Sequence, residues 1–104
     1  MRPVSLITGA SRGLGRATAL SIARNDGDVI ITYKSRQTEA EDVVAQVQAL
    51  GGKAVALALD VGNVASFPAF ASQLQEGLQR TWQRGQIDHL INNAGHGEVA
   101  PSPP

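Results

Sequence analysis

Short apolar runs alternate with longer amphipathic stretches along the whole of this 104-residue chain. The apolar runs are rich in β-branched residues or continuously apolar, which is typical of strands covered on both faces. The stretches between them repeat apolar residues at helical spacing, as Val43, Val47 and Leu50 do. The pattern predicts strands at 4–8, 29–33, 54–59 and 87–92, and helices at about 13–24, 39–50 and from 63 or 66 to 82.

The regular alternation of strand and helix predicts an α/β fold. Crossover connections of this kind join parallel strands and place helices on both faces of the sheet. We therefore expect a Rossmann-type doubly wound parallel sheet of four strands in the order 3-2-1-4, with three helices. Residues 1–97 would form this domain, and residues 98–104 a proline-rich tail.

Three glycines lie between the first predicted strand and the first helix. Gly9 would let the chain turn tightly, Gly13 would let backbone N–H groups approach a phosphate, and Gly15 would let the helix pack closely. The start of a helix attracts anions because its first N–H groups are unpaired and its dipole is positive there. The stretch predicts a dinucleotide pyrophosphate site. The alternative is a structural turn whose glycines serve packing alone.

The end of the second predicted strand bears on which dinucleotide would bind. An NAD site usually has an Asp or Glu there that binds the ribose hydroxyls, but this chain has Tyr33. Asp26 and Asp28 lie at the opposite end of that strand, too far away to reach the ribose. The usual signature of an NAD site is therefore missing.

Positive charge surrounds the same predicted site. Arg12 lies in the glycine turn, and Lys34 and Arg36 follow the second strand. An arginine can pair with a 2′-phosphate, which a carboxylate would repel. The sequence therefore favours NADP(H) over NAD(H). The alternative for Lys34 and Arg36 is a solvated loop with no ligand.

Two later strand ends also carry polar residues. Asp60 would accept the adenine amino hydrogen, with Val61 supplying backbone contacts, or Asp60 would instead cap the helix that follows. Buried amide side chains need hydrogen bonds, so Asn92–Asn93 would bridge neighbouring strands or hold the loop near the ribose. Ala94–Gly95 would leave room for a ligand against the backbone.

Taken together, these motifs resemble the short-chain dehydrogenase/reductase family. The motifs are Thr8–Gly15, Asp60–Val61 and Asn92–Gly95, in the family's order and spanning almost the whole chain. The Ser-Arg pair of the glycine turn is most similar to reductases of the 3-oxoacyl-carrier-protein type, whose cofactor is usually NADPH. The resemblance implies hydride transfer between a nicotinamide and a carbonyl or alcohol. It also implies a set of cofactor-lining residues: Gly9, Ser11, Arg12, Gly13, Leu14, Asp60, Val61, Asn92, Asn93, Ala94 and Gly95.

The family's catalytic residues have no counterpart in this chain. Family members are considerably longer, and their catalytic Ser and Tyr-x-x-x-Lys pair follow the Asn-Asn-Ala-Gly motif. The single tyrosine, Tyr33, has Gln37 four residues later, so no catalytic residue is assigned. His89 is expected to pack within a strand, and no metal-ligand cluster is predicted.

Composition argues against several other classes of protein. The net charge is +0 and the isoelectric point about 6.7, which gives no sign of a nucleic-acid or anionic-membrane partner. The lack of cysteine excludes disulfides and a thiolate nucleophile and fits a cytoplasmic protein. No apolar run approaches the ~20 residues of a membrane span.

The main hypothesis is the NADP(H)-binding half of an oxidoreductase that is not catalytic by itself. The alternatives are a non-enzymatic nucleotide-binding or partner module, and a non-functional remnant. In the expected strand order the fourth strand has an open edge, which predicts a marginally stable chain that self-associates or takes up a complementing second half.

Overall fold

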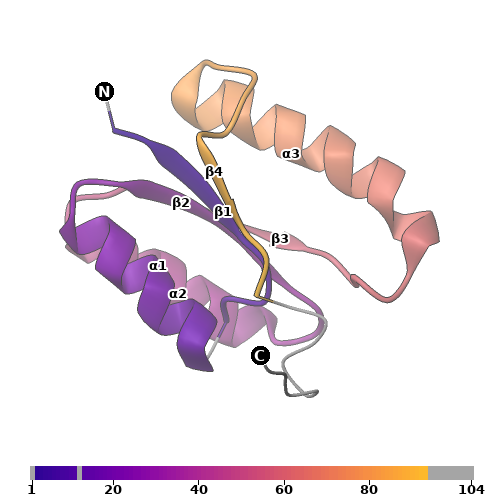
Figure 1. The fold of residues 1–104 in the computed structure, drawn as a ribbon, viewed down its shortest axis with the longest axis horizontal. Helices are drawn as coiled ribbons and strands as arrows, with labels where there is room; N and C mark the ends of the chain where they lie inside the picture. The colour runs from indigo at the N-terminus through magenta and orange to yellow at the C-terminus, as the bar shows by residue number, and fades with distance from the viewer. Residues whose placement is uncertain (1, 12, 94–104) are drawn as a thin grey trace.

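The computed structural model describes residues 2–11 and 13–93, which form a parallel sheet between two layers of helices (Figure 1). The strand order is β3-β2-β1-β4, which confirms the predicted order 3-2-1-4. The elements are β1 (Val4–Ile7), α1 (Gly13–Arg24), β2 (Asp28–Tyr33), α2 (Gln37–Ala49), β3 (Ala54–Ala58), a 3-10 turn (Val64–Ser66), α3 (Phe67–Trp82) and β4 (His89–Ile91).

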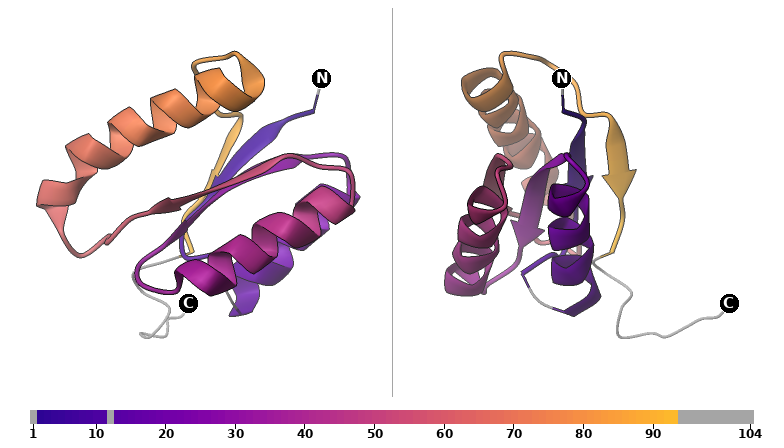
Figure 2. Two further views of the ribbon diagram at one scale, coloured as in Figure 1. Left: turned by 180° about the vertical axis from the view of Figure 1, so that it is seen from behind. Right: turned by 90° about the vertical axis from the view of Figure 1, so that its left-hand side faces the viewer.

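The sheet separates two apolar cores. Helices α1 and α2 lie on one side of it and α3 on the other (Figures 1 and 2). Side chains alternate along β1, so that Ile7 joins the core under α1 and α2 while Val4 and Leu6 join the core under α3. Ile31 and Ile30 divide in the same way on β2. Both faces of the central strands are therefore buried, as the apolar runs predict.

Strand β4 is shorter and more exposed than the sequence predicts. Its parallel pairing with β1 covers only Ser5 to Ile7 on that strand. The expectation that His89 packs inside the sheet is wrong, because His89 is exposed. Leu90 is 62% exposed, although it is paired with the buried Leu6. The reason is that β4 has a strand neighbour on one side only within the described residues.

A buried carboxylate fastens the amino end of the sheet. Asp28 is 2% exposed and accepts hydrogen bonds from Arg2 Nε at 2.8 Å, the Lys53 amide at 2.9 Å and Trp82 Nε1 at 2.8 Å. Burial raises the pKa of Asp28, but these hydrogen bonds and the charge of Arg2 outweigh it and hold the pKa below its usual value. We call these four residues the Asp28 cluster. It joins β2 to the starts of β1 and β3 and to the end of α3.

The chain offers no sign of a membrane segment or a metal site where the structure describes it. None of the described helices is long and apolar enough to cross a membrane. Nor do three or more His, Asp or Glu side chains come together in those residues as a metal ion would require.

Candidate functional site

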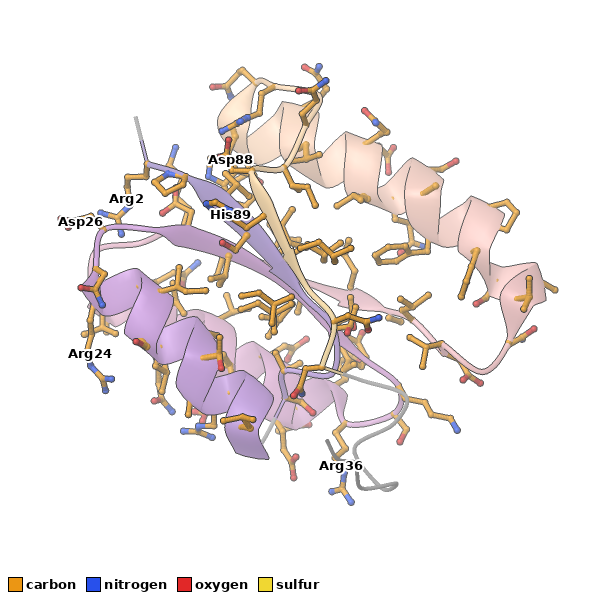
Figure 3. All side chains as sticks on the ribbon, in the orientation of Figure 1. Arg2, Arg24, Asp26, Arg36, Asp88 and His89 are labelled. Atoms are coloured by element: carbon orange, nitrogen blue, oxygen red, sulfur yellow. The ribbon has the colours of Figure 1, made fainter. Side chains whose placement is uncertain are left out.

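A cavity of about 990 Å³ lies at the carboxyl ends of the strands. This is the edge where ligands of doubly wound sheets bind. Asp26 and Arg2 lie at the opposite end of the sheet. Figure 3 shows both far from Arg36, which follows the carboxyl end of β2. Several residues predicted to bind a cofactor line the cavity: Gly9, Tyr33, Lys34, Asp60, Val61 and Asn92.

The turn between β1 and α1 has the geometry of an anion site. Gly13, the first residue of α1, has φ of +64° and open space where a Cβ would lie. The backbone there is accessible to a ligand in a conformation that other residues rarely adopt. The first turn of α1 contains no acidic residue that would repel an anion. These features fit a phosphate group bound by the amides at the start of α1.

Gly15 is required for close packing rather than for conformational freedom. A Cβ at this position would lie 2.6 Å from the Gly9 carbonyl oxygen, 2.7 Å from Asn93 Nδ2 and 2.9 Å from Ala10 Cα. Two of these contacts are with backbone atoms of the turn itself. Any larger side chain would therefore push α1 away from the turn.

The two strands that flank β1 hold the turn in place. On the β2 side, Thr32 Oγ1 accepts from the Gly9 amide at 3.0 Å, and the Thr32 carbonyl accepts from the Ala10 amide at 3.1 Å. On the β4 side, Asn93 Nδ2 donates to the Gly9 carbonyl at 3.0 Å. Sequence reasoning missed Thr32. The only signal was a hydroxyl in an otherwise apolar strand end.

The two asparagines after β4 bridge neighbouring strands, which was one of the two roles expected for them. Thr8 Oγ1 donates to Asn92 Oδ1 at 3.1 Å and accepts from the Asn93 amide at 2.9 Å. The Thr8 amide also donates to the Ile91 carbonyl at 3.1 Å. The ends of β1 and β4 are thereby tied together beside the glycine turn.

The predicted cations do not all face the cavity. Lys34 lines it together with Tyr33, whose carbonyl accepts from the Leu59 amide at 2.8 Å. Arg36 is not among the described residues that line the cavity, and its Nη1 pairs with Glu39 Oε2 at 3.3 Å. Because β2 ends in Tyr33, no carboxylate stands at this strand end.

Asp60 lines the cavity but does not cap the helix that follows. Its Oδ1 accepts from the Gly62 amide at 2.9 Å and closes a tight turn. Asn63 is the residue that caps the 3-10 turn, since its side chain accepts from the Ala65 amide at 3.2 Å. The alternative role of Asp60 as a helix cap is therefore wrong.

The remaining predicted residues are less informative. Ser11 is buried in the turn, whereas Leu14 is 75% exposed at the start of α1. Neither belongs to the described residues that line the cavity. Arg12 and Ala94–Gly95 lie outside the described residues.

The cavity also has an apolar side that sequence reasoning missed. It is formed by Leu6 of β1, Leu90 of β4, and Phe67, Phe70 and Ala71 of α3. The pairing of Leu6 with Leu90 places both on the face of the sheet toward α3. Strand alternation predicts which strand residues share a face of the sheet, but it does not predict that this face borders the site.

Comparison with known proteins agrees with this architecture. The family model for short chain dehydrogenase matches residues 3–103. The chain belongs to the short-chain dehydrogenase family. It is 42% identical over 93 residues to the 1-cyclohexenylcarbonyl-CoA reductase of Streptomyces collinus, covering 89% of this chain and 31% of that protein. It is 40% identical over 93 residues to a 3-oxoacyl-[acyl-carrier-protein] reductase of Synechocystis, covering 88% of this chain and 35% of that protein.

Solved structures of this family share the fold. The reductase LugOII, which catalyses a keto-reduction in lugdunomycin biosynthesis, superposes with a TM-score of 0.83 at 35% identity, covering 88% of this chain and 38% of that chain. Acetoin dehydrogenase from Enterobacter cloacae gives 0.76 at 33% identity, covering 91% of this chain and 35% of that chain. This chain therefore spans about a third of the length of its relatives.

Proposed function

We propose that this chain is the NADP(H)-binding portion of a short-chain reductase. The observation that carries the proposal is the open glycine turn at the start of α1, beside a cavity whose β2 edge carries Tyr33 and Lys34 in place of an acid. Such a turn binds a pyrophosphate through backbone amides, and the lack of a carboxylate leaves room for a 2′-phosphate.

Each part of the site has a separate task in this proposal. The amides around Gly13 bind the pyrophosphate, and the Asp60 carboxylate accepts from the adenine amino group. Asn93 acts indirectly, because its bond to the Gly9 carbonyl holds the turn in the binding conformation. The nicotinamide, when bound, supplies or accepts the hydride, and the protein positions it.

Lys34 supports NADP(H) over NAD(H), together with the predicted contribution of Arg12. A lysine at the cavity lining attracts the two extra negative charges of a 2′-phosphate, whereas NAD(H) offers only hydroxyls there. The match to a 3-oxoacyl-[acyl-carrier-protein] reductase supports a reductase that acts on a carbonyl compound.

We propose further that these 104 residues do not transfer hydride without additional polypeptide. The sequence contains no Tyr-x-x-x-Lys pair, and its relatives are about three times longer. Leu90 is exposed, and β4 pairs on one side only among residues 2–11 and 13–93, so they offer that polypeptide an apolar face and a strand edge side by side. Without it, the same surface favours self-association. A purely nucleotide-binding module is the second candidate, favoured by the same cavity.

Titration of the purified chain with NADPH and with NADH tests the proposal. Saturable binding, followed by cofactor fluorescence, should favour NADPH, and no NADPH should be consumed when carbonyl compounds are added. Sedimentation velocity over a range of concentrations would measure self-association. Failure to bind either cofactor by a folded chain would refute cofactor binding. Steady consumption of NADPH would refute the proposed lack of catalysis.

A further inference from the structure

The segment between β2 and α2 carries two cations that differ in their surroundings. Lys34 is exposed, lines the cavity, and has no ion pair or hydrogen bond to its side chain among the described residues. Arg36 lies two residues further on and outside the described cavity lining. Figure 3 shows the Arg36 side chain at the outer end of this segment. Lys34 and Arg36 carry the same charge, but only Lys34 is placed to meet a ligand in the cavity.

Arg36 is held by the first turn of the helix that it precedes. Its carbonyl accepts from the Ala40 amide at 3.0 Å, which starts α2, and its guanidinium turns over that helix to pair with Glu39. The pair joins Arg36 Nη1 to Glu39 Oε2 at 3.3 Å, three residues apart along the chain. Residues at this spacing lie next to each other on a helix surface.

Within residues 2–11 and 13–93, only one of the two Glu39 carboxylate oxygens is paired, on a side chain that is 43% exposed. Its second oxygen, Oε1, is buried and has no hydrogen-bond partner among the described residues. A carboxylate with one unsatisfied oxygen loses more when its one cationic partner leaves than a fully hydrated carboxylate does. Moving Arg36 to a ligand would therefore leave Glu39 both unpaired and partly desolvated.

From this geometry we infer that Glu39 is a specificity-determining residue that keeps Arg36 away from the cofactor's 2′-phosphate. Lys34 then carries the recognition of that phosphate within this segment, and Glu39 limits the preference for NADP(H). Glu39 acts through Arg36 and is therefore a positioning residue. The inference rests on the proposed binding of NADP(H), and it assigns opposite effects to Lys34 and Glu39.

Two small ligands isolate the 2′-phosphate: adenosine 2′,5′-bisphosphate and AMP, which differ in that group alone. The quantity to measure is the ratio of their affinities for the full chain, by calorimetry. Lys34→Ala should lower the ratio about 10-fold, as expected for a hydrogen bond between charged groups in a half-open site. Arg36→Ala should change the affinity ratio less than about 2-fold. Arg36 is paired with Glu39 in the free chain, and an exposed ion pair contributes little free energy.

Glu39→Gln gives the sharper result. It removes the charge that holds Arg36, so the ratio should rise about 2- to 5-fold, the range expected for release of an exposed ion pair. The rise should vanish in the double variant Glu39→Gln/Arg36→Ala. Arg24→Ala is the matched control, since Arg24 lies in the last turn of α1, away from Arg36 (Figure 3), and the ratio should stay unchanged.

The outcomes separate this inference from the proposed function. Failure of the parent chain to bind either ligand, or equal affinity for both, overturns the NADP(H) assignment and the inference with it. A clear preference in the parent, combined with a larger loss from Arg36→Ala than from Lys34→Ala, overturns the inference alone. The inference alone is also overturned if Glu39→Gln leaves the affinity ratio unchanged, or if Glu39→Gln raises the ratio by the same factor in a chain that carries Arg36→Ala.

Discussion

The two ends of this sheet use their polar groups differently. At the amino end, the buried Asp28 carboxylate receives three hydrogen bonds, from Trp82 of α3 and from the segments just before β1 and β3. At the carboxyl end, Gly9 of the turn and Lys34 line a cavity of about 990 Å³, and Gly13 further along the turn has open space where a Cβ would lie. The amino end uses its buried carboxylate to hold the elements together, whereas the carboxyl end ties its strands through Thr8, Thr32 and Asn93 and still leaves Lys34 available to a ligand.

This difference explains why acidic residues near β2 carry no information about the cofactor. Asp28 is the first residue of β2, and its carboxylate is hydrogen-bonded within the Asp28 cluster. Asp26 lies just before β2 at the same edge, with its Oδ1 3.7 Å from Arg2 Nη1. Both were predicted to lie too far from the ribose, and the structure places both at the amino end of the sheet (Figure 3). The position that decides between cofactors is the other end of the same strand.

Replacing Asp28 with Asn should produce the largest loss of stability at the amino end. The variant keeps the shape of the side chain but removes the charge and replaces one acceptor oxygen by an NH2 group, which would face a donor. We expect the free energy of unfolding to fall by about 3 kcal/mol, as for a buried charge network that loses one partner. Urea unfolding followed by far-ultraviolet circular dichroism would measure it.

The matched control is Asp26→Asn, whose carboxylate is 93% exposed. Its loss should stay below about 0.5 kcal/mol, because exposed pairs contribute little. Cofactor affinity of the folded fraction should be unchanged in both variants. Similar losses in the two variants would contradict the distinct role of the Asp28 cluster.

At the carboxyl end, Gly15→Ala should affect binding and stability together. The added methyl group would meet the Gly9 carbonyl oxygen at 2.6 Å and must displace the turn. We expect a loss of about 1–3 kcal/mol in the free energy of unfolding, as for overpacked sites. NADPH affinity should fall at least about 10-fold, since misplaced amides no longer converge on the phosphate.

Gly77→Ala is the control for this substitution. A Cβ there would make ordinary contact with Val55 Cγ1 at 3.7 Å, in the interior of α3. It should raise the free energy of unfolding by about 0.5–1 kcal/mol and leave NADPH binding unchanged. Tight NADPH binding by Gly15→Ala would show that the turn tolerates movement, and it would contradict the role given to the position of the turn in this site.

Local sequence patterns were enough to predict the strands, the helices and the glycine turn, and the strand order followed from the doubly wound topology that their alternation indicates. Strand alternation, helical spacing and a turn rich in glycine are set by neighbouring residues, so they can be read without the fold. The limits of β4 were harder to predict. Its apolar pattern suggests a buried strand, but His89 and Leu90 are exposed because nothing in the described residues covers that edge.

Contacts between distant residues could not be predicted. Trp82 and Asp28 are 54 positions apart, and nothing in the sequence around either one indicates their hydrogen bond. The same holds for Thr32, whose hydroxyl is directed at the Gly9 amide by the pairing of β1 with β2. Arg36 was left with two alternatives, a ligand contact or a solvated loop. Its pairing with Glu39, three residues further on, is a local contact that neither alternative included.

The pH dependence of stability is the smallest effect expected from the comparison. Because the hydrogen bonds hold the folded-state pKa of Asp28 below 3.8, the unfolded chain binds more protons near that pH. The stabilisation is therefore complete above 3.8 and is lost as the pH falls from there through the folded-state pKa. Urea unfolding from neutral pH down to about pH 2 should show this loss.

Asp88 must be separated from Asp28 in that experiment. The Val4 amide and Arg84 also lower the pKa of Asp88, so both carboxylates act in the same direction. The acid dependence should weaken in Asp28→Asn and in Asp88→Asn, and weaken most in the double variant. If Asp28→Asn kept the full acid dependence of the parent, the hydrogen bonds of the Asp28 cluster would not favour the charged form, and the amino end would be held by packing alone.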